Sequence, residues 1–311
     1  MSLNLINIAE GLTHLQEQAA DIHINPSNYG VTREIISKGE EVKGKKNDYT
    51  SRVDQVVEAR IKPALLNLVP NSGFLGEETA SSGMGNRYRW IVDPTDGTAI
   101  YSLGGEYYSN STSLIDREAN NGNGAVVLGS VYQSAIGKQF LMVGNELVVR
   151  EKIFTPKGIS TIERIPKPSR SECFPEFMGC SFGTSAHLNK NPALQERLKK
   201  VFEKQEVSFD RSYPTINAKP ASGSSALFCS DIADGKRHFA LLFFQKAWDL
   251  AVGAVYAQKA GCPVVMFDNS GNATSENLET TIAQCDMKTL TSVGVFANES
   301  VKDYILEKFN K

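Results

Sequence analysis

The chain has 311 residues, of which 41% are hydrophobic and 22% charged, and its net charge is -2. This composition is typical of a globular protein of about two domains, and the small net charge gives no electrostatic reason to expect a nucleic acid polymer or an anionic membrane as a partner. No apolar run reaches the ~20 residues of a membrane span and the five cysteines lack C-x-x-C spacing, so we expect a cytoplasmic protein without a disulfide framework.

The first predicted element is an amphipathic helix, because apolar residues recur at helical spacing until Asn25-Pro26. His14 and His23 fall on this helix. Since no cysteine or second histidine lies at a metal-ligand spacing, we interpret both histidines as structural.

A charged, glycine-containing segment, 39–47, predicts a loop that is either a solvated connection or a cationic flap over an anionic substrate. A second amphipathic helix follows it, with Thr50 or Ser51 as the candidate N-cap. This places Asp54 in the first turns of the helix, where an acid is by default structural.

Two successive strand ends present carboxylates. The segment 73–76 predicts a short strand that ends at Glu77 and Glu78. Adjacent residues of an extended chain point to opposite faces, so only one of these two acids can face a given site.

The run 90–92 predicts a buried strand that ends in the sequence Asp-Pro-Thr-Asp-Gly-Thr, residues 93–98. The proline is expected to turn the chain and direct Asp93 and Asp96 toward one small volume, with the backbone amides of the last two residues beside it. Carboxylates next to an anion-binding backbone predict Mg²⁺ beside a phosphate. An ordinary turn between two elements is the alternative.

The rest of the chain predicts an antiparallel sheet between 109 and 149 and then an alternation of strands and helices. The proline-rich segment 156–175 is the expected crossing between an α+β domain, 1–160, and an α/β domain, 161–311. In the second half, Asp249 follows an apolar strand at the start of a helix, as the acids of the first half follow theirs. The elements expected there are strands near 177–181, 239–244 and 292–296 and helices near 192–204, 222–234, 248–261 and 299–309.

Three acidic strand ends together suit a site for two dications, because ions roughly 4 Å apart require several anionic ligands. Without cations, converging carboxylates would repel one another and raise their pKa values.

Three motifs occur in order: Gly76-Glu77-Glu78, Asp93-Pro-Thr-Asp-Gly-Thr98, and Trp248-Asp249 followed by Leu-Ala-Val-Gly253. They resemble the signatures of the inositol monophosphatase superfamily, which includes inositol monophosphatases, fructose-1,6-bisphosphatases and 3′(2′),5′-bisphosphate nucleotidases. The resemblance extends from about Lys43 to about Asp268. It implies a layered αβαβα sandwich, a homodimer, and hydrolysis of a small phosphomonoester with two or three Mg²⁺ per active site.

The resemblance also implies roles for particular residues. The metal ligands would be Glu77, Asp93, the backbone carbonyl of Thr95, Asp96 and Asp249. Substrate contacts would come from Asp96, Gly97, Thr98, Gly223, Ser224, Ser225 and Asp249. The catalytic residues, which orient and activate the attacking water, would be Glu77, Thr98, Asp54 and Lys43. Asp54 thereby changes from a structural to a catalytic residue on resemblance alone.

Departures from the family pattern concern the substrate. Where inositol monophosphatases carry an acid for a substrate hydroxyl, seven residues before Asp249, this chain has Leu242, which cannot accept a hydrogen bond. The insertion 182–221 is expected to reshape the pocket. Inositol monophosphate is therefore the lead substrate, with a nucleotide 3′-phosphate or a sugar phosphate as alternatives. A catalytically silent protein that binds a phosphorylated ligand is the alternative from another class.

Overall fold

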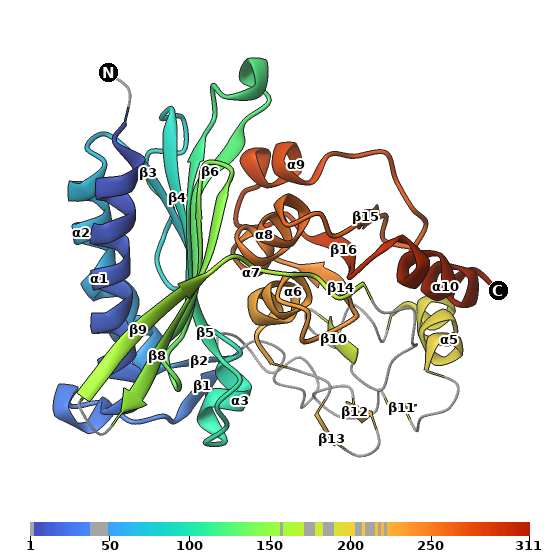
Figure 1. Ribbon diagram of the computed structural model, residues 1–311, viewed down its shortest axis with the longest axis horizontal. Helices are drawn as coiled ribbons and strands as arrows, with labels where there is room; N and C mark the ends of the chain where they lie inside the picture. Colours follow the sequence, from blue (N-terminus) through green and yellow to red (C-terminus); the bar gives the residue numbers. More distant parts are fainter. Residues whose placement is uncertain are drawn as a thin grey trace.

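The computed structural model has five layers, helix, sheet, helix, sheet and helix, which confirms the predicted αβαβα sandwich (Figure 1). The structure describes residues 3–37, 49–155, 158–170, 178–182, 190–202, 207–208, 215–216, 219–220 and 223–311. Within this part of the chain, no helix is both long and apolar enough to cross a membrane.

The first layer consists of α1 (Leu5–Ile24) and α2 (Arg52–Leu68). The helix α1 ends where Pro26 begins the short 3₁₀ helix η1 (Pro26–Tyr29), as the proline predicts. The helix α2 begins with a capping box, in which the Asp54 amide donates to Ser51 Oγ and the Ser51 amide donates to the Asp54 carboxylate. Of the two candidate caps, Ser51 is therefore the one used.

The first sheet has seven strands in the order β3-β4-β5-β6-β7-β8-β9. Its strands are β3 (Gly73–Gly76), β4 (Tyr88–Asp96), β5 (Ser109–Asp116), β6 (Ala125–Gln133), β7 (Lys138–Val143), β8 (Glu146–Thr155) and β9 (Gly158–Arg164). Only β3 and β4 pair in parallel, and all other neighbours are antiparallel, as the alternating segments predicted. Beside this sheet lie the short pair β1 (Ile35–Ser37) and β2 (Tyr49–Ser51) and the 3₁₀ turn η2 (Asn120–Gly122).

Part of the segment 156–175, where we expected the crossing between domains, is a strand. Residues 158–164 form β9, which pairs with β8 from Val149↔Arg164 to Thr155↔Gly158. The prolines at 156, 166 and 168 flank this strand and do not interrupt it. The sequence between them was therefore compatible with a strand, which we did not predict. The proposed domain boundary near residue 160 falls inside β9, and the first sheet continues to Arg164.

The second sheet has the order β10-β14-β16-β15 and mixes parallel and antiparallel pairs. Its strands are β10 (Met178–Phe182), β14 (Phe239–Gln245), β15 (Val264–Phe267) and β16 (Thr291–Phe296). Between the two sheets lie α6 (Ser225–Ala233), α7 (Ala247–Leu250), α8 (Gly253–Lys259) and α9 (Leu278–Gln284), and the outer layer is α5 (Pro192–Val201) and α10 (Glu299–Asn310). Three very short strands, β11 (Val207–Ser208), β12 (Thr215–Ile216) and β13 (Lys219–Pro220), form a separate sheet.

The helix predicted over 248–261 is divided into α7 and α8, and β15 and α9 were not predicted. The helix α8 can pack closely on α6 because residue 253 is a glycine. A Cβ at this position would lie 2.4 Å from the carbonyl oxygen of Ala226. Helices this short contain too few turns for a clear apolar period.

Three apolar clusters hold the layers together. Trp90 and Leu12 belong to the cluster beneath α1 and α2, Leu227 and Val252 to the one between the sheets, and Phe243 and Phe309 to the one beneath α5 and α10. Burying each such large side chain contributes roughly 1.5–3 kcal/mol. The middle cluster is common to both sheets, so the two halves share one core where the acidic strand ends meet.

Candidate active site

Three carboxylates converge at the ends of β4 and the start of α7. The oxygens of Asp93, Asp96 and Asp249 lie within 4.8 Å of one another, and Asp93 is 1% exposed. The sequence prediction that these three residues meet is therefore correct as geometry. Glu77 joins them, because β3 runs parallel to β4 with Gly76 beside Val92, which brings the next residue of each strand to the same edge.

A bulge, and not the proline alone, directs Asp93 and Asp96 to one side. We expected the strand to end at Pro94, whereas β4 continues to Asp96. Its register with β5 shifts between Asp93↔Ser111 and Asp96↔Ser109, so three residues of β4 span two of β5. In a regular strand, residues three apart point to opposite faces, and the extra residue of the bulge removes this alternation.

Electrostatics at the cluster favours a cation. Burial raises the pKa of Asp93 well above its ordinary range, and the charges of Glu77, Asp96 and Asp249 raise it further. Burial also raises the pKa of Asp96, to about 6. A divalent cation would remove this repulsion, and an all-oxygen donor set suits a hard ion such as Mg²⁺. The residues present therefore fit a magnesium site.

The start of α6 holds Asp96 in place. Ser224 Oγ donates to Asp96 Oδ2 at 2.6 Å and the Ala226 amide donates to the same oxygen at 2.7 Å, while the Ser225 amide donates to Oδ1 at 3.1 Å. The Ser225 hydroxyl donates to Gln245 at 2.8 Å. These serines, predicted as substrate contacts, thus orient a candidate metal ligand, and their contact with substrate stays a prediction.

Gly97 and Gly223 pack where these elements meet. Gly97 has φ 91°, caps the short helix α3 (Thr98–Ser102), and leaves only 3.0 Å between a would-be Cβ and the Ser224 amide nitrogen. At Gly223 a Cβ would lie 2.9 Å from the Tyr107 ring. A short helix begins after Gly97, and both glycines permit a close approach of backbone that a side chain would prevent.

Thr98 and Asp54 lie next to each other beside the cluster. Thr98 Oγ1 donates to the Thr95 carbonyl oxygen at 2.9 Å and lies 3.4 Å from Asp54 Oδ2. Asp54 is 1% exposed, and its Oδ1 has no hydrogen-bond partner among the described residues. Burial raises the pKa of Asp54 to about 6. Asp54 is therefore both a structural acid in the first turn of α2, where it completes the capping box of Ser51, and a neighbour of Thr98, as the family resemblance implied.

Glu77 and Glu78 separate as the extended chain predicts. The charge of Glu77 acts on Asp93, whereas the Glu78 carboxylate accepts a hydrogen bond from Thr50 Oγ1 at 2.8 Å. The Glu78 amide donates to Glu58 of α2 at 3.0 Å. Glu77 is thus the acid of this pair that faces the cluster.

Sequence reasoning missed the contribution of α1. His23, interpreted as structural, is 0% exposed, with Nε2 2.9 Å from Thr95 Oγ1 and Nδ1 3.0 Å from Ser134 Oγ. Burial lowers the pKa of His23 to about 3, so its ring is neutral. Gln16, seven residues earlier, is buried as well. The available signal was that both polar residues fall on the apolar stripe of a helix.

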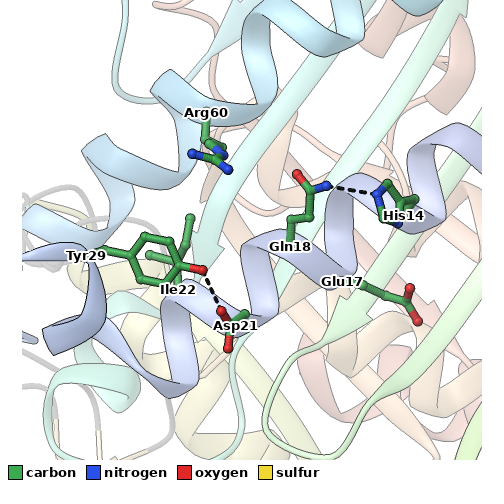
Figure 2. A pocket seen from close by; sticks show the side chains of 7 residues that line it. All are labelled: His14, Glu17, Gln18, Asp21, Ile22, Tyr29 and Arg60. Atoms are coloured by element: carbon green, nitrogen blue, oxygen red, sulfur yellow. Dashed lines mark hydrogen bonds between the residues drawn. The ribbon is translucent and has the colours of Figure 1, made fainter.

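Two open pockets lie outside the cluster. One, of about 250 Å³, lies at α1, η1 and α2, where Tyr29 donates to Asp21 at 2.5 Å (Figure 2). It is lined by His14, Glu17, Gln18, Asp21, Ile22, Tyr29 and Arg60. The other, of about 490 Å³, is lined by Lys190, Asn191, Phe244, Asn269, Lys288 and Leu290. Neither lining includes a residue that we predicted for the site.

Three further predictions concern the segments and side chains away from the acidic cluster. Lys43 lies outside the described residues, as does half of the insertion 182–221. Leu242 is fully buried in the core between the sheets and offers no hydrogen-bond acceptor from its side chain. Of the cysteines that the structure describes, Cys229 and Cys262 are buried free thiols, and so is Cys285.

Comparisons with known proteins agree with this geometry. The model of the inositol monophosphatase family matches residues 13–309. The fructose-1,6-bisphosphatase/inositol-1-monophosphatase of Aquifex aeolicus is 28% identical over 224 residues, which cover 71% of this chain and 73% of that protein. Among solved structures, the extragenic suppressor protein suhB from Bartonella henselae has a TM-score of 0.67 at 18% identity, covering 99% of this chain and 98% of that one. The Thermotoga maritima IMPase has a TM-score of 0.64 at 16% identity, with 96% and 94% covered. These two structures share the fold.

Proposed function

Because this chain belongs to the inositol monophosphatase family, we propose that it is a Mg²⁺-dependent phosphatase that hydrolyses a small phosphomonoester, with myo-inositol monophosphate as the lead substrate. The observation that carries this proposal is the convergence of Asp93, Asp96 and Asp249 in a buried cluster. Such a cluster is costly unless cations compensate its charge. Its place at the start of a short helix with backbone amides suits a phosphate beside the cations.

The ligands of two or three Mg²⁺ would be Glu77, Asp93, the carbonyl of Thr95, Asp96 and Asp249. When bound, these ions neutralise phosphate charge and lower the pKa of water. The raised pKa of Asp93 supports this assignment, since its neighbours disfavour its ionised form in the absence of a cation. The approach of four acids from β3, β4 and α7 supplies the negative charge that such a centre requires.

The residues around the ligands would position the reaction. Thr98 and Asp54, whose side-chain oxygens lie 3.4 Å apart, would orient the attacking water together with Glu77, and one of the two carboxylates would accept its proton. The amides of Gly97 and Thr98 would hold the phosphate as it is transferred to water. The P–O bond to the leaving group would break as the new P–O bond forms, and the leaving alkoxide would take a proton from solvent water. Lys43, as the family resemblance implies, would add positive charge near the phosphate.

Substrate contacts are proposed for the turns that border the cluster. Gly223, Ser224 and Ser225 would border the bound substrate, while the two serine hydroxyls donate to Asp96 and Gln245 and the Ser225 amide donates to Asp96. Asp96 and Asp249 would meet the leaving group. The buried, apolar Leu242 weakens the case for inositol, so a nucleotide 3′-phosphate or a sugar (bis)phosphate is the alternative.

A panel assay separates these substrates. Metal-free protein is supplied with Mg²⁺ and inositol, nucleotide or sugar phosphates, and released phosphate is measured. We expect turnover of at least one class and none after chelation. If no substrate released phosphate with Mg²⁺ while the protein still bound phosphorylated ligands, the silent ligand-binding alternative would replace the phosphatase.

We also propose a homodimer in the cytoplasm, on the grounds of the family resemblance and the free, buried thiols. Light scattering coupled to gel filtration gives the mass of the assembly directly. A monomer at micromolar concentration would contradict the dimer and would leave the proposed chemistry unaffected.

A further inference from the structure

The first helix reaches the acidic turn through one buried face. Gln16 and His23 lie two turns apart on α1, and both are buried. Gln16 Nε2 donates to Asn110 Oδ1 at 3.0 Å, and Asn110 Nδ2 donates to the carbonyl oxygens of Asp93 at 3.2 Å and Pro94 at 3.3 Å. His23 contacts the next residue, Thr95. One helix face thus supports three consecutive residues of the turn.

The surroundings of His23 leave its ring little freedom. Tyr101 and Tyr108 pack edge-on against it with centroid distances of 5.5 and 5.4 Å, and Tyr101 donates to the His23 carbonyl oxygen at 2.9 Å. Its Nε2 lies 2.9 Å from Thr95 Oγ1 and its Nδ1 lies 3.0 Å from Ser134 Oγ. The ring is therefore fixed between one hydroxyl behind the sheet and one hydroxyl in the turn.

The two ring nitrogens of His23 connect two hydroxyl groups. A neutral histidine has one donor and one acceptor, whereas a hydroxyl can either donate or accept. Two arrangements therefore satisfy both contacts: Nε2–H donates to Thr95 Oγ1 and Nδ1 accepts from Ser134 Oγ, or each bond runs in the opposite direction. In both arrangements the ring links the Thr95 hydroxyl to Ser134.

We propose that His23 is a positioning residue for phosphate-ester hydrolysis, which fixes the side chain of Thr95 so that the Thr95 carbonyl holds Thr98. Thr95 is where this contact matters, because its carbonyl oxygen accepts from Thr98 Oγ1 at 2.9 Å and its side chain contacts His23. Rotation of this one residue would move both the carbonyl and the hydroxyl. The inference rests on the proposed function, because kcat can be measured only if the protein hydrolyses a phosphate ester. Mg²⁺ affinity is therefore measured as well, since it does not depend on hydrolysis.

Four variants test the contact. His23→Leu removes the ring nitrogens, Thr95→Val removes the hydroxyl at nearly constant volume, and the double variant removes both. His23→Gln keeps an amide that can donate or accept near the position of Nε2. The matched control is His14→Leu, which changes an exposed histidine on the same helix. Each variant is assayed for kcat and KM with the substrate of the wild-type protein, and for Mg²⁺ affinity by calorimetry without substrate.

His23→Leu and Thr95→Val are each expected to lower kcat by about 10- to 100-fold and to weaken Mg²⁺ binding by about tenfold, with KM nearly unchanged, since residues behind metal ligands typically have effects of this size. The double variant is expected to be no worse than Thr95→Val, because both changes break one contact. His23→Gln should recover most of the loss, and His14→Leu should match the wild type.

Wild-type kcat and Mg²⁺ affinity in His23→Leu, or losses that multiply in the double variant, would overturn the inference. If His23→Leu does not fold, wild-type behaviour of Thr95→Val would overturn it from the other end of the contact. A wild-type protein that binds Mg²⁺ but releases no phosphate would contradict the proposed function alone, and the Mg²⁺ affinities of the variants would still decide the role of His23.

Discussion

Ser224, at the N-cap of α6 in the second half of the chain, donates its hydroxyl to Asp96, the last residue of β4 in the first half, at 2.6 Å. The same oxygen of Ser224 accepts the Leu227 amide at 3.0 Å. The side chain that caps α6 therefore also orients a proposed metal ligand. Through this hydrogen bond, the second half of the chain controls a ligand that the first half supplies.

This relationship predicts the effect of Ser224→Ala. Loss of the cap is expected to reduce the free energy of unfolding by about 1 kcal/mol, and loss of the contact with Asp96 should weaken Mg²⁺ activation about 10- to 100-fold. Denaturant unfolding and Mg²⁺ titration of phosphate release measure the two effects. Ser230→Ala is the matched control, because this buried serine of α6 donates to the helical carbonyl of Ala226. Equal Mg²⁺ dependence of the two variants would contradict the role of Ser224.

Neutralising Asp93 should stabilise the metal-free protein. Its pKa is raised by burial and by four neighbouring acids, so the ionised form is unfavourable when no cation is bound. Asp93→Asn is expected to raise the free energy of unfolding of the metal-free protein by roughly 1–3 kcal/mol and to remove the further stabilisation that Mg²⁺ gives the wild type. Asp116→Asn, which removes a carboxylate paired with Arg87, should not stabilise the protein. Thermal unfolding with and without Mg²⁺ tests both, and a destabilised Asp93→Asn protein would refute the account of the cluster.

Acid should weaken the contact between β9 and α6. Burial alone would raise the pKa of Asp234, but hydrogen bonds from Arg164 and Lys138 hold it below its ordinary value of 3.8. Above pH 3.8 the carboxylate is ionised in both folded and unfolded chains and its contribution is complete. As pH falls below this value the unfolded chain binds a proton first, so the contribution is lost through the folded pKa.

Asp234→Asn should therefore lower the free energy of unfolding by roughly 3 kcal/mol at pH 7, since it removes the buried carboxylate that Lys138 and Arg164 share and leaves them only the longer or more exposed contacts with Glu151 and Asp231. The difference from the wild type should shrink at about pH 3 and below. Urea unfolding at both pH values measures it. A difference that stayed constant with pH would show that packing, and not charge, accounts for the effect.

Alanine substitutions at two glycines distinguish the cost of a positive φ from the cost of a steric clash. Gly97 has φ 91° and Gly104 has φ 79°, but only a Cβ at Gly97 would meet other atoms within 4 Å. Alanine at Gly104 should cost about 1–2 kcal/mol of stability and leave activity intact. Alanine at Gly97 should cost more and abolish phosphate release, because it pushes α6 away from α3. Equal effects at the two positions would mean that the close packing on Ser224 is unimportant.

The sequence predicted those features of the site that depend on residues close together in the chain. These are the end of a strand at Gly76 and the order of the acidic motifs. Which oxygens meet across elements is not local. The bulge in β4 depends on pairing with β5, and the hydrogen bond from Ser224 to Asp96 depends on the docking of α6.

Two further differences have the same origin. His23 follows the apolar period of α1, so its spacing indicated only that it is buried, and its partner Thr95 lies 72 residues away. The strand β9 consists of exposed residues from 159 to 163 and depends on β8 for its structure, so it carried no pattern of burial. Sequence periodicity reports which side of an element is buried, and it does not report what that side contacts.

The central claim is that the acids of β3, β4 and α7 form a metal centre for phosphate-ester hydrolysis. The most direct test compares Mg²⁺-dependent phosphate release by the wild-type protein, the chelated protein, the chelated protein resupplied with Mg²⁺, and Asp93→Asn. We predict release by the first and third samples only. Full turnover of every substrate by Asp93→Asn, or turnover unchanged by chelation, would contradict the claim.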